Sequence, residues 1–465
     1  MRLWLPFWLA MAASSAQAVG DSSIVTVEAR EHLKALIRLD TSNPPGNEIL
    51  AAEYLKAQLD LAKIPADIYT STGSRASVVA RLKAPKESRQ RRPLILMCHT
   101  DVVPADSKEW VTDPFTPVEK DGYLYGRGAS DNKDMCAAEL AVMVSLRRSS
   151  AALNRDIVFF AEADEESGEK DRHIDWLLRT YPDLLDARYA INEGGNTVWE
   201  KGKVTEVRVQ TAEKIYMDVT LVAKGEAGHA SVPRADNAVA AIARSVTRLE
   251  AHRFRARLNE AVQHFFRRQA ETSEPMVKAA ILDVLRAPPG EALDNAADRL
   301  TAAKPEFGAM LRDTLSATML RGGYKSNVIP AEAAATFNAR LLPGRDPSDF
   351  LAEIALVVDN PAVAVVADTI SAVGSEVMPT DTEFYRAIES SAHELSPAAA
   401  VMPFMAAWTT DSQKLRERGV ITYGVEPPTL SSDDGVHGKN ERIALEAFDW
   451  YVRFLRAVVI KVVSP

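Results

Sequence analysis

The feature that most constrains the fold is a regular alternation of strand-like and helix-like segments over the first part of the chain. Short apolar runs, typical of buried strands, alternate with stretches in which apolar residues recur every three or four positions. The strand-like segments are residues 76–82, 93–98, 156–161 and 189–191, and the helical ones are 28–39, 48–64, 134–148 and 174–181. This alternation predicts an α/β domain in which helices cover a central sheet.

The pattern changes after about residue 211. Residues 214–224 alternate as a half-exposed strand, and a helical insertion rich in Ala, Arg and Glu occupies about 251–318. We expect a first domain made of residues 19–211 and 372–465, with an inserted α+β sandwich domain, 212–371, between its two parts. The remaining elements expected in the inserted domain are a helix at 237–250, a strand at 333–341, a helix at 347–357 and a strand at 362–370.

The N-terminus indicates export. Arg2 supplies a positive charge, residues 3–13 are apolar, and Ala16-Gln17-Ala18 matches a cleavage pattern, so residues 1–18 are typical of a signal peptide. A membrane anchor is the alternative, but the apolar run is shorter than the roughly 20 residues that span a bilayer. The mature protein is therefore expected in the periplasm or outside the cell, with no membrane attachment after cleavage.

An exported chain meets oxidising conditions, under which Cys98 and Cys136 could pair. Because side chains alternate along a strand, Cys98 turns away from the side that His99 faces. We therefore expect two separate buried thiols.

Composition and charge exclude several classes of protein. Of 465 residues, 46% are hydrophobic and 26% charged, which is typical of a globular protein. A formal net charge of −9 argues against a nucleic-acid partner. Gly126-Arg127-Gly128 lacks the third glycine of a dinucleotide-binding loop, and the chain has no Gly-x-Ser-x-Gly motif of a serine hydrolase.

Acidic and histidine side chains follow three of the expected strands. His99-Thr100-Asp101 ends the first, Glu162 to Glu166 contains four acidic residues after the second, and Asn192-Glu193 ends the third. Asp131 precedes an expected helix, and His437 lies between Val436 and Gly438 in an expected loop. Each feature alone has an ordinary explanation as a surface histidine, a solvated loop or a helix N-cap.

Together these residues indicate a metal site. His99, Asp131, Glu166, Glu193 and His437 are nitrogen and oxygen donors without a thiolate, a set that suits a hydrolytic centre of two divalent cations. So many anions at strand ends are costly unless positive charge neutralises them. Zinc is the leading metal, and Co²⁺ or Mn²⁺ fits the same ligands. Glu165, adjacent to Glu166, is left free as a general base.

In their order along the chain, these motifs resemble those of the dinuclear zinc peptidases of family M20. They read HTDVVP at 99–104, GRGASDNKD at 126–134, EADEESG at 162–168, NEGG at 192–195, GHASVP at 228–233, NVIP at 327–330 and VHGKNE at 436–441. The residues of these motifs are similar to those of the carboxypeptidase S branch. The resemblance implies an α/β zinc-peptidase domain with a mixed central sheet flanked by helices, plus an inserted α+β lid or dimerisation domain.

The resemblance also implies a role for each matching position. His99, Asp131 and Glu193 would hold one zinc and Asp131, Glu166 and His437 the other, giving two Zn²⁺ per subunit. Asp101 would orient His99, Glu165 would act as general base and then acid, and the Asp131–Asn132 peptide bond would be cis. His229 would stabilise the oxyanion, in dimeric members from the partner subunit, and Asn327 and Arg340 would contact the substrate carboxylate. Asn132 and Asp134 depart from the aspartate and glycine that many members carry.

The expected activity is hydrolysis of an amide bond beside a free carboxylate, as in carboxypeptidases and dipeptidases. N-acyl-amino-acid hydrolysis, as in aminoacylases, is the alternative. A further alternative is a non-catalytic binding protein of the same fold. Such a protein would not need Glu165, a carboxylate that is left free of the metal as a general base. The expected partner is a small peptide or an N-acyl amino acid, without nucleic acid or membrane, and a homodimer remains open.

Overall fold

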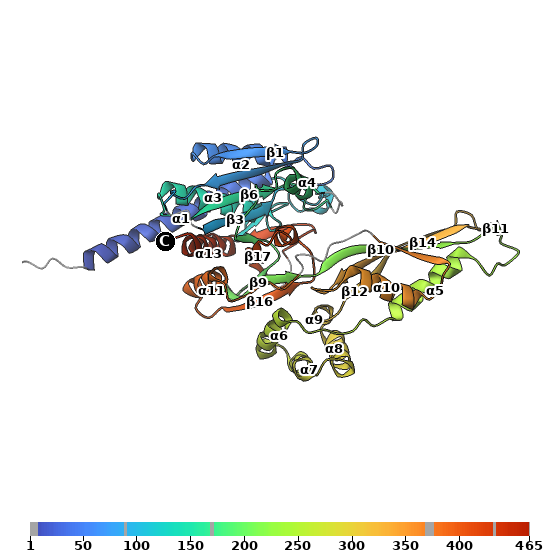
Figure 1. The fold of residues 1–465 in the computed structure, drawn as a ribbon. Helices are drawn as coiled ribbons and strands as arrows, with labels where there is room; N and C mark the ends of the chain where they lie inside the picture. Colours follow the sequence, from blue (N-terminus) through green and yellow to red (C-terminus); the bar gives the residue numbers. More distant parts are fainter. Residues whose placement is uncertain (1–7, 88–90, 168–171, 368–375, 431–433, 465) are drawn as a thin grey trace, which may run out of the picture. The chain divides into compact units, whose positions relative to one another are not determined.

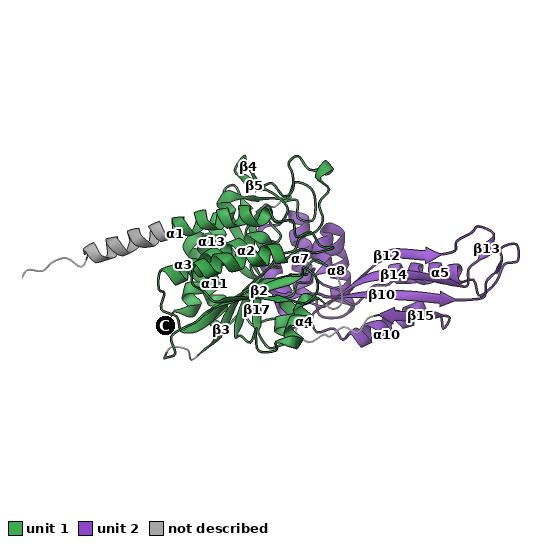
Figure 2. Ribbon diagram, turned by 90° about the horizontal axis from the view of Figure 1, so that it is seen from above, with its two compact units in different colours: residues 1–210, 378–402, 410–465 green, residues 211–377, 403–409 purple. Residues whose placement is uncertain are grey.

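The computed structural model describes residues 8–87, 91–167, 172–367, 376–430 and 434–464, so the expected signal peptide lies partly outside the described residues. The chain forms two compact units (Figures 1 and 2). Unit 1 is made of Met1–Gln210, Met378–Met402 and Thr410–Pro465, and unit 2 of Thr211–Val377 and Pro403–Thr409. Each unit has an apolar core of its own.

The larger sheet is mixed. Its strand order is β1 (Ala66–Thr70), β2 (Ala76–Leu82), β6 (Arg155–Glu162), β3 (Arg91–His99), β7 (Tyr189–Asn192), β17 (Ile421–Gly424), β9 (Lys203–Glu213), β8 (Asn196–Glu200) and β18 (Thr429–Leu430), and β16 (Ala400–Ala406) pairs with β9. The neighbours β6, β3, β7 and β17 are parallel. Residues that follow these strands are therefore brought to one edge of the sheet.

Helices cover both faces of this sheet, which explains why its strands are continuously apolar. In β3, Leu94 and Leu96 face one core, whereas Ile95 and Met97 face the other. The first core includes side chains of α1 (Trp8–Ile37), α2 (Ile49–Leu61), α3 (Lys133–Arg148), α11 (Glu383–Leu395) and α13 (Leu445–Val463), and the second those of α4 (His173–Thr180) and α12 (Ser412–Arg416).

The two cysteines form a disulfide, so the prediction of separate thiols is wrong. Alternation along β3 does turn Cys98 away from the side that His99 faces, but the face to which it turns is covered by α3, where Cys136 lies. Their Cα atoms are 5.3 Å apart, and the residues are separated by 38 positions. The bond therefore links the end of β3 to the first turn of α3.

Unit 2 contains an antiparallel sheet in the order β12 (Thr314–Gly322), β14 (Glu332–Leu341), β10 (Ile215–Lys224) and β15 (Val363–Ala367). Helices α5 (Ala238–Ala251) and α10 (Pro347–Val358) pack on this sheet, and buried residues alternate along β10 and β14. The elements expected at 214–224, 237–250, 333–341 and 347–357 are confirmed within one residue. The last three residues of the strand expected at 362–370 lie outside the described residues.

The helical insertion ends earlier than predicted. Its helices are α6 (Glu260–Thr272), α7 (Pro275–Arg286), α8 (Glu291–Ala303) and α9 (Pro305–Ala309), but Thr314–Gly322 is strand β12, so the prediction of helix up to about residue 318 is wrong. Strand β12 lies at the edge of its sheet, and its residues are exposed from Ser316 onward. It therefore lacks the apolar alternation by which a half-buried strand is recognised.

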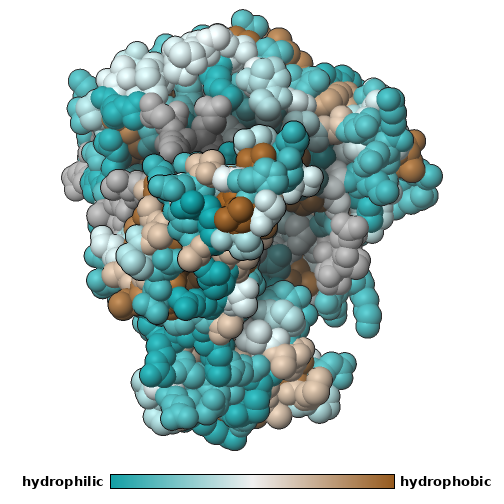
Figure 3. Space-filling model, turned by 90° about the vertical axis from the view of Figure 1, so that its right-hand side faces the viewer, coloured by the Kyte–Doolittle hydropathy of each residue, from teal (hydrophilic) through white to brown (hydrophobic). Residues whose placement is uncertain are grey.

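Two smaller sheets complete the fold. In unit 2, β11 (Gly228–His229) pairs with β13 (Val328–Ile329), and in unit 1, β19 (Arg442–Ala444), β5 (Tyr123–Tyr125) and β4 (Val118–Lys120) form a three-stranded sheet. The helices of the described residues include none that combines the length and the apolar character needed to cross a bilayer. The face shown in Figure 3 is mainly hydrophilic, with hydrophobic residues in small separate groups.

Candidate metal centre

Three predicted ligands lie at the edge where the parallel strands end. His99 is the last residue of β3 and pairs in register with Glu162, the last residue of β6, from which the chain continues to Glu166. Glu193 directly follows β7. Asp131 precedes α3, and His437 lies in the loop before β19. Parallel strand ends thus gather residues that are far apart in the sequence.

The five predicted ligands form two groups that share Asp131. The groups are His99, Asp131 and Glu193, and Asp131, Glu166 and His437, each with one donor atom per residue within 4.8 Å of the others. His99 Nε2 lies 3.1 Å from Asp131 Oδ1 and 3.6 Å from Glu193 Oε2. His437 Nε2 lies 3.0 Å from both Asp131 Oδ2 and Glu166 Oε1. The two oxygens of Asp131 therefore face different groups.

The second ring nitrogen of His99 is held by the backbone. Nδ1 lies 3.1 Å from the carbonyl oxygen of Asp101, which can only accept, so Nδ1 carries the proton and donates. The Asp101 carboxylate is farther from this nitrogen, at 3.5 Å. This carboxylate instead accepts from the backbone N–H groups of Glu165, at 3.2 Å, and Glu166, at 2.9 Å. Asp101 thus fixes the His99 ring through its carbonyl and the Glu165–Glu166 backbone through its side chain.

Backbone geometry shapes the site at two further points. The Asp131–Asn132 peptide bond is cis, as the family resemblance implies. Gly194, next to Glu193, has φ +99°, and a Cβ there would lie 2.3 Å from Gln210 Nε2. Only glycine fits this position, where the Gly194 N–H donates to Glu426 Oε2 at 3.2 Å.

The charges of the site fit divalent cations. Burial acts to lower the pKa of His99, but Glu193, Asp101 and Asp131 outweigh it and raise this pKa well above its usual value. Hydrogen bonds to Asp131 and Glu166 raise the pKa of His437 to about 10. Positive charge is thus strongly favoured beside these carboxylates, and oxygen and imidazole donors in this number suit zinc and similar metals.

Glu165 belongs to neither group. Its side chain is 15% exposed, and burial together with Glu193 raises its pKa well above the usual value. A carboxyl group that lies beside the candidate ligands without joining them can accept and return a proton.

Glu441 is a positioning residue to which the sequence analysis assigned no role. It is fully buried, and its carboxylate accepts from the backbone N–H groups of Gly128, Ser130 and Asp131 at 2.8–3.2 Å and pairs with Arg127. Burial raises its pKa to about 7. Glu441 is the last residue of the VHGKNE motif, and this position in the sequence could have indicated a role at the site. Through Glu441, the His437 loop holds the loop that presents Asp131.

His229 and Asn327 lie together in unit 2. His229 pairs with Val328, and the Ala230 N–H donates to the Asn327 carbonyl at 3.1 Å. His229 is exposed, and its Nδ1 accepts from the Ser231 backbone N–H at 3.1 Å. Nδ1 is therefore unprotonated, and the ring proton lies on Nε2, where it can be donated.

Arg340 lies in β14, opposite Tyr216 of β10, with its guanidinium 4.6 Å from the centre of the Tyr216 ring. Nε donates to Asn338 at 3.1 Å and Nη1 to Thr409 at 3.1 Å. Nη2 donates to no side chain or carbonyl among the described residues. The guanidinium is thus fixed in place with one edge available to an anion.

The structure does not bring Arg340 together with His229 and Asn327. Along β14, Arg340 lies eight residues from Glu332, which corresponds to roughly 26 Å of strand. The His229–Asn327 pair lies beyond the Glu332 end, since Gly225 N–H donates to the Ala331 carbonyl and the chain then continues to β11 (Figure 1). Asn327 and Arg340 were expected to contact one carboxylate. Within one chain they lie at opposite ends of the sheet.

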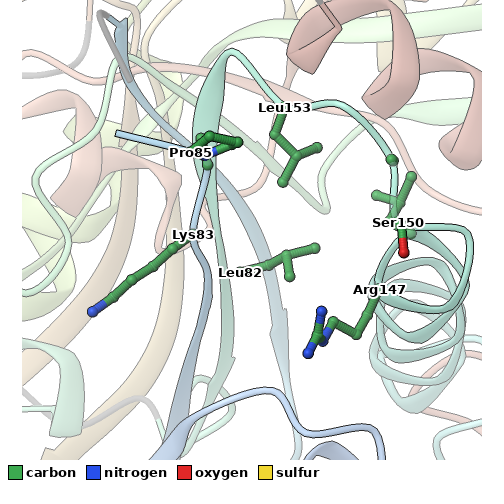
Figure 4. A pocket seen from close by; sticks show the side chains of 9 residues that line it. Leu82, Lys83, Pro85, Arg147, Ser150 and Leu153 are labelled. Carbon is green, nitrogen blue, oxygen red and sulfur yellow. The ribbon is translucent and has the colours of Figure 1, made fainter. Parts of the chain in front are cut away.

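A cavity of about 310 Å³ lies elsewhere in unit 1 (Figure 4). It is formed where β2 and α3 end, far along α3 from Asp131. None of the predicted site residues lines it; its lining residues include Leu82, Lys83, Pro85, Arg147, Ser150 and Leu153.

Comparison with known proteins identifies the class of enzyme. Residues 95–461 match the model of peptidase family M20/M25/M40, and the chain therefore belongs to this family of peptidases and amidohydrolases. The N-fatty-acyl-amino acid synthase/hydrolase PM20D1 of Xenopus tropicalis is 27% identical over 78% of this chain and 71% of its own length. The probable carboxypeptidase S-like 2 of Dictyostelium discoideum is 26% identical over 78% of this chain and 70% of its own.

Solved structures share the fold. The M20 family metallo-carboxypeptidase Sso-CP2 from Sulfolobus solfataricus has a TM-score of 0.70 at 19% identity, covering 93% of this chain and 98% of its own. Human carnosine dipeptidase 1 has a TM-score of 0.64 at 16% identity, covering 95% and 97%. The predicted α/β fold with a mixed sheet flanked by helices is confirmed.

Proposed function

We propose that this protein is an exported, zinc-dependent hydrolase that cleaves an amide bond next to a free carboxylate, as a carboxypeptidase or dipeptidase does. The observation that carries the proposal is the pair of ligand groups joined by Asp131, with Glu165 beside them. A structural acidic cluster needs neither a shared carboxylate between two histidines nor a separate buried carboxyl group next in sequence to a ligand.

His99, Asp131 and Glu193 would hold one cation, and Asp131, Glu166 and His437 the second. Bound cations supply Lewis-acid polarisation of the amide carbonyl and lower the pKa of water. Glu165 takes a proton from the attacking water at its carboxylate and gives it to the leaving nitrogen. His229 donates from Nε2 to the carbonyl oxygen as negative charge develops there.

Arg340 would select substrates with a free carboxylate. Its guanidinium is already oriented by Asn338 and Thr409, so little conformational freedom is lost when an anion binds the open edge. His229 and Asn327 lie at the end of the unit 2 sheet opposite to Arg340, so these residues of one chain are too far apart to contact the same substrate. We therefore propose that His229 and Asn327 act on the substrate of a second copy. The active form is then a homodimer.

Hydrolysis of N-acyl amino acids is the second candidate. These substrates also carry a carboxylate beside the amide, and the similarity to PM20D1 enzymes favours them. Export is supported by the pattern at residues 1–18 and by the Cys98–Cys136 disulfide, which persists in oxidising compartments.

The test is mass-spectrometric product analysis on a library of dipeptides, longer peptides and N-acyl amino acids, with and without a chelator. We expect chelator-sensitive cleavage beside a free carboxylate and no cleavage of the matching carboxamides. The product set separates peptidase from acylase activity. Bound metal without cleavage of any member would contradict the proposal and favour a binding protein.

A further inference from the structure

A buried ion pair lies behind Glu165. Arg172, directly before α4, pairs through Nη2 with Asp411, directly before α12. Asp411 is fully buried, and the Arg172 side chain is 18% exposed. Nη1, the other end of the same guanidinium, lies 4.0 Å from Glu165 Oε1. One planar group thus faces two carboxylates, and all three residues belong to unit 1.

Asp411 is paired with Arg172 and also lies next to the buried carboxyl group of Glu162. Beyond the ion pair with Arg172 and the contact with Glu162, no other described residue donates a hydrogen bond to the Asp411 carboxylate. Burial and Asp411 raise the pKa of Glu162 well above its usual value. Arg172 is therefore the cation that compensates the buried charge of Asp411, and removing it would leave that charge uncompensated.

Glu165 itself has little else to fix its side chain. Its backbone is held by Asp101, but the Arg172 guanidinium is the cationic group within 4.0 Å of its carboxylate among the described residues. A proton-transfer group must keep its carboxylate oriented through the reaction, and a displacement of about 1 Å can cost about 10²-fold in rate.

We propose that Arg172, anchored by Asp411, is a positioning residue that orients the Glu165 carboxylate for proton transfer. The inference rests on the function proposed for Glu165. The competing explanation is that Arg172 merely neutralises buried Asp411 and supports the packing of α4 against α12.

A second ion pair between the same two helices provides a matched control. Lys414 of α12 lies 2.8 Å from Asp175 of α4, with both side chains about as exposed as Arg172. If the charge link between α4 and α12 were what mattered, Lys414→Gln would slow the enzyme as much as Arg172→Gln.

The experiment compares the zinc-loaded wild type with R172Q, D411N, the R172Q/D411N double variant and K414Q. Each is measured for kcat, KM, zinc content and Tm on the best substrate of the library. We expect R172Q to lower kcat about 10–100-fold, with KM within about twofold and zinc retained. The double variant should be as slow as R172Q, added guanidinium should restore part of the R172Q rate, and K414Q should match the wild type.

Full recovery of kcat in the double variant would overturn the proposal. It would show that Arg172 is needed only to neutralise Asp411, because turnover would return once both charges are removed. An equal loss in K414Q, or a loss of zinc in R172Q, would overturn it as well. If R172Q does not fold, Arg172→Lys, which keeps the charge but not the two-ended fork, serves instead: a normal kcat there contradicts the proposal. Failure of the proposed function is seen separately, as absence of cleavage by the wild type.

Discussion

His437 Nε2 lies 3.0 Å from Asp131 Oδ2, although the two residues come from opposite parts of the sequence. The contact is supported by Glu441, four residues after His437, whose carboxylate accepts hydrogen bonds from the backbone N–H groups of Ser130 and Asp131. The loop that carries His437 and the loop that carries Asp131 are therefore held together around the shared Asp131 carboxylate. A change in either loop is expected to affect the same ligand group.

Glu165 is expected to be needed for turnover but not for metal binding. Glu165→Gln preserves the shape of the side chain and removes its basicity, so kcat should fall about 10²-fold or more, the range of general-base catalysis. Zinc content, measured by mass spectrometry, should be unchanged, because Glu165 belongs to neither ligand group. An undiminished kcat with zinc verified would remove Glu165 from the mechanism.

The separation of His229 from Arg340 predicts complementation between inactive variants. A heterodimer of His229→Ala and Glu165→Gln chains contains one site in which both residues are intact, provided that His229 acts on the partner's substrate. Mixing the two under conditions that exchange subunits should therefore restore roughly a quarter of the wild-type activity. If His229 acts within its own chain, every site carries one defect and the mixture stays inactive.

Because of the buried Glu139 of α3, we expect the free energy of unfolding of the protein to depend on pH. Glu139 is fully buried, its oxygens have no hydrogen-bond donor among the described residues, and burial raises its pKa well above the usual value. The unfolded chain releases this proton near its ordinary pKa of about 4.3, whereas the folded chain keeps it to higher pH. Folding then takes up a proton, so this group's contribution to stability is lost as pH rises between the two pKa values.

Glu139→Gln should accordingly stabilise the protein more at pH 8 than at pH 5, as measured by urea midpoints. Glu446→Gln, at an exposed position of α13, is the control and should change neither value. An equal effect of E139Q at both pH values would show that Glu139 does not carry this dependence.

The disulfide predicts a stabilising cross-link close to the site. Closing a loop over 38 positions contributes at most about 4 kcal/mol by restricting the unfolded chain. The intact protein should have a mass lower by two thiol hydrogens than its reduced form, and the C98S/C136S variant should unfold at a lower denaturant concentration. Free thiols in protein purified from an oxidising compartment would contradict this pairing.

Much of the site could be predicted because its residues follow strands that are easy to recognise. Apolar runs locate β3, β6 and β7, and once these are parallel neighbours, His99, Glu166 and Glu193 must end at one edge. The residues that act through long-range contacts could not be predicted in this way. Glu441 and Arg172 carry ordinary charged side chains, and only the folded chain shows which backbone or carboxylate each one meets.

The errors also have physical causes. The pairing of Cys98 depended on which helix covers the far face of β3, information that strand periodicity does not contain. Strand β12 was assigned to the insertion because an exposed edge strand lacks an apolar face. The contact of Asn327 and Arg340 with one carboxylate, by contrast, stays a prediction: their separation within one chain follows from the register of β14, and a second copy would supply the missing partner.

We propose that His99, Asp131, Glu166, Glu193 and His437 hold two divalent cations that share Asp131. The most direct test is the metal content of the purified protein by inductively coupled plasma mass spectrometry, for the wild type, His437→Ala and Asp131→Ala. We expect two zinc ions per chain in the wild type, about one in H437A, and fewer than one in D131A because both groups lose a ligand. A wild type that holds no transition metal, or a D131A variant that keeps both ions, would contradict it.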